Sequence, residues 1–174
     1  MPSSYYHTEA LILKKMPFGE ADFLVRALTK DFGKLDILAK GARKAHAKLN
    51  AHLDMLNVVR VSFVQNGERI PTLIDAERIA AYDDWFSDME HMEVAGKMLR
   101  TIDLMIPQGS PDPELFSFVS HAFEAAPTGQ LAEYGIGFLR RVLSHEGYGD
   151  TFDPDALPGE LTQSILEIWP ALKN

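Results

Sequence analysis

The spacing of apolar residues changes near residue 83, and this change limits the possible folds more than any other feature of the sequence. Before residue 83, short runs contain strand-forming residues with alternating apolar and polar character. After it, apolar residues recur at steps of three and four, which is typical of helices. We therefore predict an α+β protein with two domains, residues 1–80 and 81–174, and no linker between them.

The first domain is predicted to consist of five short strands, over residues 8–15, 22–29, 35–40, 56–65 and 70–77. Asn66-Gly67 favours a type I′ hairpin turn, in which both central residues take a positive φ. Pro71 places the fifth strand near an edge or at its own start. Because the longest connection joins the third and fourth strands, the pattern fits a closed five-stranded OB-fold β-barrel. An open five-stranded sheet or an SH3-like barrel fits nearly as well.

The second domain is predicted to be all α. A first helix follows the apolar residues from Trp85 to Ile106, with Asp83 or Asp84 as its cap. Further helices are expected over residues 112–123, 128–146 and 159–169.

The first of these helices carries four of the seven methionines: Met89, Met92, Met98 and Met105. Methionines at helical spacing usually fill a core, and that is the simpler interpretation. The alternative is an adaptable groove for a partner peptide, with Met89 and Met92 as candidate contacts.

The charge of the chain, formally -8, is divided unevenly. Residues 1–80 contain 12 Lys or Arg against 9 Asp or Glu, a net charge of +3. Residues 81–174 contain 5 Lys or Arg against 16 Asp or Glu, a net charge of -11. A polyanion would be attracted to the first domain and repelled by the second.

Several classes of protein can be excluded. The chain has no cysteine, which excludes disulfides, Cys-ligated zinc and a thiol nucleophile. It has neither an apolar run of membrane-spanning length nor a signal peptide, so we expect a cytoplasmic protein. Phosphate-loop, zinc-protease and nucleophile-elbow motifs are absent, so we expect no enzyme activity, no catalytic residue, no cofactor and no metal.

Two fragments resemble functional motifs only in part. Gly135-Ile136-Gly137 begins like a dinucleotide-binding motif, but no strand precedes it, and we expect it to allow close helix packing. His46, His52 and Asp54 match no known metal-ligand spacing, and we interpret the histidines as solvated.

A cationic stretch lies within residues 33–53, where five Lys or Arg stand against Asp36 alone. Such a cluster in an acidic chain suggests a phosphate-binding surface, although a merely solvated face is the alternative. Phe18 and Phe32 lie in predicted turns, where they either stack a base or belong to the core. The candidate DNA-binding residues are Lys34, Lys40, Arg43, Lys44 and Lys48, extended by Lys14, Lys15, Arg26 and Arg60.

Three motifs of the first domain occur together: Gly19-Glu20-Ala21-Asp22, Thr29 followed by Gly33, and Ala39-Lys40-Gly41-Ala42-Arg43. With Phe138-Leu139 and Gly147-Tyr148 in the second domain, they resemble the RecO family of bacterial recombination mediators. The resemblance implies an OB-fold followed by a helical domain, without covalent catalysis. It also implies binding of single- and double-stranded DNA, strand annealing and recombinase loading. The partners it implies are RecR and the acidic C-terminal tail of single-stranded DNA-binding protein.

The second domain departs from the pattern of that family. Many relatives carry a Cys-rich zinc module after the Gly-Tyr element, whereas this chain has no cysteine and ends about 26 residues past Tyr148. We therefore expect a shortened helical domain. Relatives tend to place Arg before the Phe and Glu after it, whereas this chain has Gly137 before Phe138 and Leu139 after it. The displaced arginines, Arg140 and Arg141, are kept as candidate partner-binding residues. The rival hypothesis is an interaction adaptor that grips a basic partner through its acidic half and has a weak or vestigial DNA surface.

Overall fold

The computed structural model describes residues 3–44 and 48–173. The chain forms two compact units, each made of two segments. The barrel unit comprises Met1–Tyr82 and Gln108–His121, and the helical unit comprises Asp83–Pro107 and Ala122–Asn174. The expected division into domains 1–80 and 81–174 stays a prediction.

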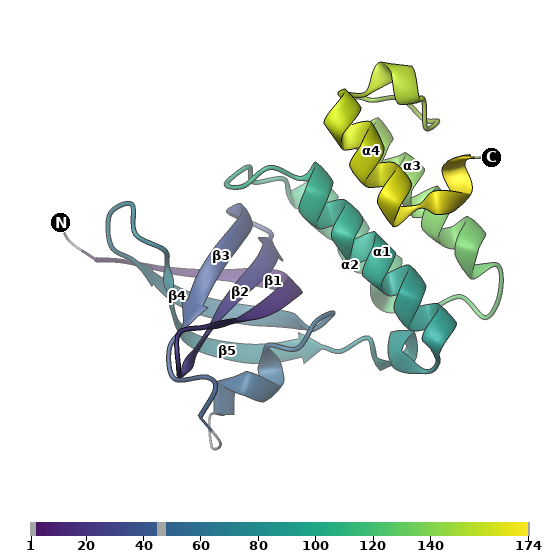
Figure 1. Ribbon diagram of the computed structural model, residues 1–174. Coiled ribbons are helices and arrows are strands. Elements are labelled where there is room, and N and C mark those ends of the chain that lie inside the picture. The colour runs from purple at the N-terminus through teal and green to yellow at the C-terminus, as the bar shows by residue number, and fades with distance from the viewer. Residues whose placement is uncertain (1–2, 45–47, 174) are drawn as a thin grey trace. The chain divides into compact units, whose positions relative to one another are not determined.

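Five strands close into a barrel in the order β1-β2-β3-β5-β4 (Figure 1). They are β1 (Ser4–Phe18), β2 (Asp22–Thr29), β3 (Gly33–Ala39), β4 (Val58–Gln65) and β5 (Thr72–Ala80), and a 3₁₀ turn, η1 (Lys48–His52), lies between β3 and β4. All neighbouring strands are antiparallel except β3 and β5, which are joined in parallel through the pair Leu38 and Thr72. The predicted OB-type barrel is confirmed, and the open-sheet alternative is wrong.

Every second residue of a strand points into the barrel, and these side chains fill its interior. One inward-facing set, which includes Ile12, Val25, Ile37, Val61 and Phe63, is at most 2% exposed. Such a core is what holds a small barrel closed, because each inward residue removes apolar surface from water.

The turn between β4 and β5 differs from the prediction. Gly67 takes a positive φ of 59°, but Asn66 does not, so the predicted type I′ turn is wrong. The connection is longer, since β5 begins only at Thr72, after Pro71. The side chain of Gln65 stabilises this loop by donating to the carbonyls of Gly67 (2.6 Å) and Arg69 (2.7 Å).

The turn between β2 and β3 explains the motif formed by Thr29 and Gly33. The Thr29 hydroxyl donates to the Gly33 carbonyl at 2.7 Å and accepts from the Phe32 amide at 3.1 Å, which closes the turn between β2 and β3. Gly33 has a φ of 69°, and a Cβ there would collide with the backbone of Ser110. The Gly109 amide also donates to the Lys34 carbonyl at 3.0 Å, so residues 108–110 pack against the start of β3.

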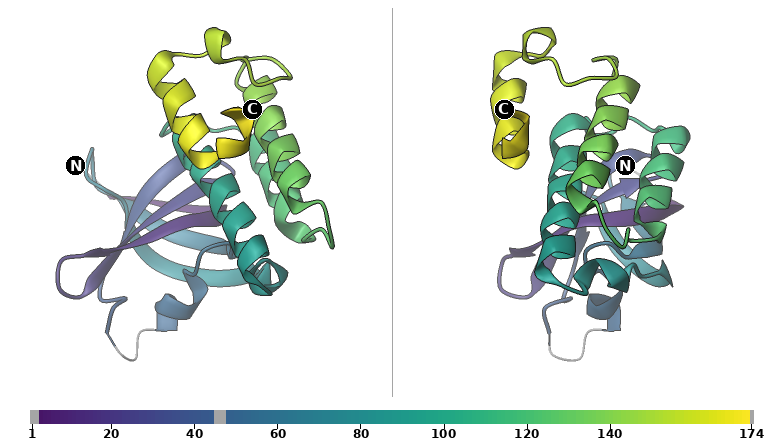
Figure 2. Two further views of the ribbon diagram at one scale, coloured as in Figure 1. Left: turned by 45° about the vertical axis from the view of Figure 1, so that its right-hand side comes forward. Right: turned by 90° about the vertical axis from the view of Figure 1, so that its right-hand side faces the viewer.

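Four α-helices follow the barrel strands: α1 (Met89–Met105), α2 (Pro113–Glu124), α3 (Leu131–His145) and α4 (Gly159–Ile168). Short 3₁₀ turns accompany them: η2 (Asp83–Phe86), η3 (Pro154–Ala156) and η4 (Pro170–Lys173). Within the helical unit, α1 packs against α3 and α4, as Figure 2 shows.

The start of α1 corrects the sequence prediction. Asp83 and Asp84 open the 3₁₀ turn η2, and the cap of α1 is Asp88, whose carboxylate accepts from the His91 amide at 3.0 Å. The helix therefore begins later than predicted, because the buried Trp85 belongs to the separate turn η2. The helix predicted over residues 128–146 likewise begins later, since α3 starts at Leu131 with Gln130 at its capping position.

Gly135 is where α3 makes its closest approach within the helical unit. A Cβ on Gly135 would lie 2.5 Å from the Trp169 ring and 3.0 Å from a Val94 methyl group. The Trp169 indole is fixed by donating to the Thr101 hydroxyl at 2.9 Å. Close packing is thus confirmed for Gly135, whereas around Gly137 no described atom lies within 4 Å of such a Cβ.

Candidate nucleic-acid interface

The basic loop after β3 is fastened to the turn between β1 and β2. The Gly41 amide donates to the Asp22 carboxylate at 2.7 Å, and the Arg43 amide donates to the Ala21 carbonyl at 2.9 Å. The Arg43 guanidinium donates to the Gly19 carbonyl at 2.7 Å. We call these three hydrogen bonds the clasp. The clasp joins the Gly19–Asp22 motif to the Ala39–Arg43 motif, so these two sequence motifs together form a single turn-and-loop structure.

The backbone of the loop suits this arrangement. Gly41 takes a φ of 68°, as expected for a residue that turns the chain away from β3 at little steric cost. Ala42 is buried, whereas its neighbours Lys40, Arg43 and Lys44 are exposed. The clasp and the buried alanine therefore hold a short loop whose cations face solvent.

Four candidate lysines have no ion-pair partner within residues 3–44 and 48–173: Lys14, Lys40, Lys44 and Lys48. Arg43 also forms no ion pair there, but its guanidinium is hydrogen-bonded in the clasp. All four lysines are exposed. Phe18, on the same turn as Gly19, is 45% exposed, so it is not core. Exposed aromatic rings and uncompensated cations are the two kinds of group that bind single-stranded nucleic acid, through stacking and phosphate contacts.

Three other candidate cations are already paired within the barrel unit. Lys15 contacts Asp54 at 2.6 Å, and Arg60 contacts Glu77 at 3.0 Å. The Arg26 guanidinium donates to both Asp36 oxygens, at 2.7 and 2.8 Å, and these hydrogen bonds lower the pKa of Asp36. The charges of Lys15, Arg26 and Arg60 are therefore compensated by neighbouring carboxylates. To bind DNA, each of these side chains would have to exchange its carboxylate for a phosphate.

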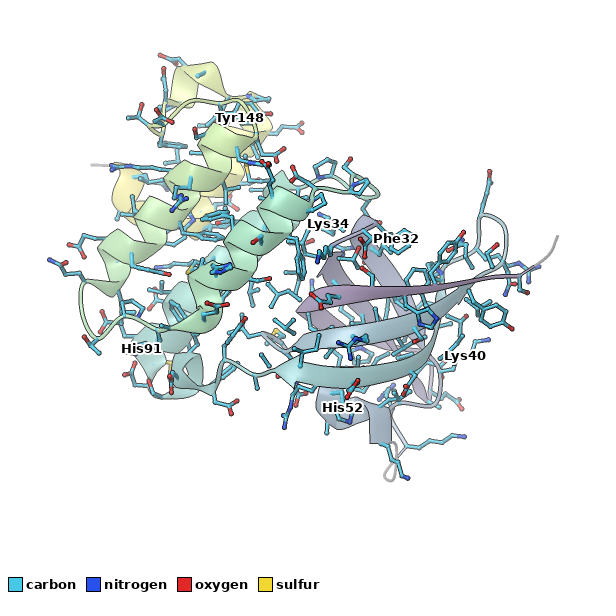
Figure 3. All side chains as sticks on the ribbon, turned by 180° about the vertical axis from the view of Figure 1, so that it is seen from behind. Phe32, Lys34, Lys40, His52, His91 and Tyr148 are labelled. Atoms are coloured by element: carbon cyan, nitrogen blue, oxygen red, sulfur yellow. The ribbon has the colours of Figure 1, made fainter. Side chains whose placement is uncertain are left out.

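Lys34 differs from the other candidates because it is buried, with 5% of its surface exposed. It lies with Phe32 at the end of the barrel away from Lys40 and His52 (Figure 3). We therefore leave Lys34 out of the surface considered below.

Phe32 belongs to an aromatic cluster with Tyr6 and Phe63, whose ring centroids are 5.2–5.5 Å apart. A pocket of about 340 Å³ opens over this cluster, with Asp31 and Gln65 among its lining residues. Phe32 is therefore part of the barrel's packing, remote from the clasp (Figure 3).

The candidate partner-binding residues fall into two places of the helical unit. Met89 and Met92 are 75% and 40% exposed, so core filling is wrong for them, while Met98 and Met105 are buried as expected. Arg140 and Arg141 are exposed and line a hollow of about 500 Å³ with Ser144, His145 and Asp150.

No three His, Asp or Glu side chains of the described residues gather in a way that would hold a metal ion. His46 lies outside the described residues, and His52 is half-buried at the end of η1. None of the helices in the described ranges is both long and apolar enough to cross a membrane.

The sequence motifs did not reveal that their residues touch. Gly19 and Asp22 lie at the turn, and Gly41 and Arg43 follow about twenty residues later in the loop. The antiparallel pairing of β2 with β3, which sets Phe23 opposite Ala39, brings the two segments together. The pairing of Arg26 with Asp36 was accessible from sequence, because a hairpin that pairs Thr29 with Gly33 also places these two residues opposite each other.

Comparisons with known proteins agree with this fold. Residues 1–82 match the family model described as recombination protein O N terminal. The chain is similar to proteins named DNA repair protein RecO from three bacteria. It is 30% identical to that of Thermodesulfovibrio yellowstonii over 112 residues, which cover 64% of this chain and 45% of the relative. The identity is 29% to the Myxococcus xanthus protein (88% of this chain, 64% of the relative) and 26% to the Nocardioides protein (94% and 68%).

The chain thus spans about half to two thirds of the length of these relatives. The family model covers all five strands of the barrel. On these matches, residues 1–82 are a RecO N-terminal domain, and the chain as a whole is similar to RecO proteins.

Proposed function

We propose that this chain is a DNA-binding protein of recombinational DNA repair, acting without covalent catalysis. The observation that carries the proposal is the clasped loop, which holds Lys40 and Lys44 exposed and without ion-pair partners among the described residues. We include Lys14, Lys48 and the ring of Phe18 in the proposed surface, because all three side chains are exposed in the same unit. The RecO N-terminal domain and the similarity to proteins named DNA repair protein RecO support the repair context.

The expected mode of binding is sequence-tolerant. Lysines contact phosphates as point charges, and an exposed phenylalanine stacks on any base. Binding of single- and double-stranded DNA, annealing of complementary strands and recombinase loading are the finer activities that we propose. A RecR-like protein and the acidic tail of single-stranded DNA-binding protein are the proposed partners, and the cytoplasmic nucleoid is the proposed location.

The proposal is tested by fluorescence anisotropy on labelled single-stranded DNA at several salt concentrations. With four cations on phosphates, log K should fall against log salt with a slope of about -3. The double change Lys40→Glu and Lys44→Glu should weaken binding strongly and reduce the magnitude of that slope to about 1.5 or less.

Lys30 provides the matched control. It is exposed in the turn between β2 and β3, at the other end of these strands, so Lys30→Glu alters net charge without touching the clasped loop. We expect the Lys30 variant to bind much more tightly than the double variant and to keep the wild-type slope. The double variant changes the net charge by four and Lys30→Glu changes it by two. A loss of log K in the Lys30 variant about half that of the double variant would mean that net charge alone governs binding, and the proposal for this loop would fail.

A further inference from the structure

We propose that residues 83–93 form a docking surface for a basic amphipathic segment of another protein. Three large apolar side chains are exposed within these residues: Phe86 at 46%, Met89 at 75% and Met92 at 40%. Met89 and Met92 are three positions apart at the start of α1, so they lie on the same side of the helix. This inference does not depend on the proposed DNA binding.

The segment that carries these side chains is firmly held. Trp85 is fully buried, and its indole donates to the Phe123 carbonyl at 3.0 Å. His91 contacts Asp88 through Nδ1 (2.8 Å) and the Pro127 carbonyl through Nε2 (3.0 Å), and both contacts raise the pKa of His91. The apolar side chains are thus presented by an ordered backbone, which lowers the entropy that a partner must remove on binding.

Carboxylates surround the exposed apolar residues. Residues 83–93 contain five acids and no Lys or Arg. Asp88 contacts His91, and Glu93 contacts Lys97 at 2.6 Å. Asp83, Asp84 and Glu90 have no ion-pair partner within residues 3–44 and 48–173. The surface therefore keeps a negative charge next to apolar contact area.

This combination selects the partner. Phosphates and acidic peptides would be repelled, whereas Lys and Arg around an apolar stripe would be attracted. Methionine side chains are flexible and polarisable, so they adapt to aliphatic or aromatic side chains of a partner. The occupant that fits is a segment with apolar residues at helical spacing, flanked by Lys or Arg.

The test uses a labelled synthetic helix with leucines at i, i+3, i+4 and i+7 and lysines elsewhere, and a second peptide in which glutamates replace the lysines. Anisotropy should show that the protein binds the lysine peptide and does not bind the glutamate peptide. Met89→Ser with Met92→Ser should weaken that binding at least about tenfold, since buried apolar anchors dominate such interfaces. Leu104→Ser, at the other end of α1 and 37% exposed, is the matched control and should leave it unchanged.

A second variant separates apolar contact from charge. Asp83→Asn, Asp84→Asn and Glu90→Gln together keep the side-chain volumes and should weaken the lysine peptide while flattening its salt dependence. The Lys40→Glu and Lys44→Glu variant should bind the peptide as the wild type does. Equal binding of both peptides, or unchanged binding after the methionine substitutions, would overturn the proposal.

Discussion

The clasp predicts that a change at Asp22 alters the affinity for DNA in the direction opposite to the one that charge alone would give. Asp22→Ala removes the carboxylate that accepts the Gly41 amide at 2.7 Å. Deleting a negative charge beside a phosphate-binding loop would, by charge alone, strengthen DNA binding. We expect the opposite result, because the loop loses one of the three hydrogen bonds that fix its cations in place.

The size of the effect follows from that hydrogen bond. Hydrogen bonds to charged groups contribute about 1.5–3 kcal/mol, and this one is only partly buried, so the lower end applies. If DNA binding must re-form the loop arrangement that the variant has lost, the free energy of binding becomes less favourable by the contribution of that hydrogen bond. A loss of about 1.4 kcal/mol corresponds to a tenfold weaker Kd. Asp22→Asn keeps an oxygen acceptor and removes the charge, so its affinity should equal or exceed that of the wild type.

Two measurements check this reasoning. Anisotropy at one fixed salt concentration ranks the three proteins, with Asp22→Ala the weakest. Amide exchange measured by NMR should show faster exchange of the Gly41 amide in Asp22→Ala, whether or not DNA is present. If Asp22→Ala bound DNA as tightly as Asp22→Asn while its Gly41 amide exchanged faster, the clasp would not position the loop.

Further predictions concern stability. Gly135→Ala should lower the free energy of unfolding by about 1–3 kcal/mol through overpacking, whereas Gly137→Ala, in open space on the same helix, should raise it by up to about 1 kcal/mol in urea titrations. Gly33→Ala should be more destabilising than Gly109→Ala, although both glycines have a φ of 69°, because only the first adds a collision to the roughly 1–2 kcal/mol of backbone strain. The pKa of His91 is raised on folding, so its stabilising contribution is complete below the unfolded-state value of 6.5 and is lost as pH rises through the folded-state pKa. The difference in unfolding free energy between the wild type and His91→Gln should therefore shrink from about pH 5.5 to about pH 8.5, and a pH-independent difference would contradict this assignment.

Much of the barrel was predictable because its turns carry local signals. The bounds of β2 were predicted correctly, since a Pro/Gly break precedes it and the Thr29 to Gly33 turn follows it. The bounds of β5 were less accurate, because the alternation of apolar residues begins before Pro71 while strand pairing begins after it. Closure of the barrel depends on contacts between distant segments, which periodicity does not encode.

The candidate interface was predictable in composition but not in geometry. Charge counting found Lys40 and Lys44, yet it could not separate them from Arg26, whose charge is compensated by Asp36. The exposure of Met89 was also hidden, because α3 and α4 decide which face of α1 is buried. Local sequence does not fix the position of a neighbouring helix, and counting charges ignores the hairpin register that sets Arg26 opposite Asp36.

Residues 108–110 have a consequence for the order in which the protein is made. They pack against Gly33 and Lys34, yet they are synthesised after the whole of α1. During translation, the β-strands leave the ribosome first and can begin to pair at once, since domains fold as they emerge. The edge at β3 is completed only when residue 110 has also emerged. Between those two moments, the nascent barrel exposes a site that only its own later segment fills.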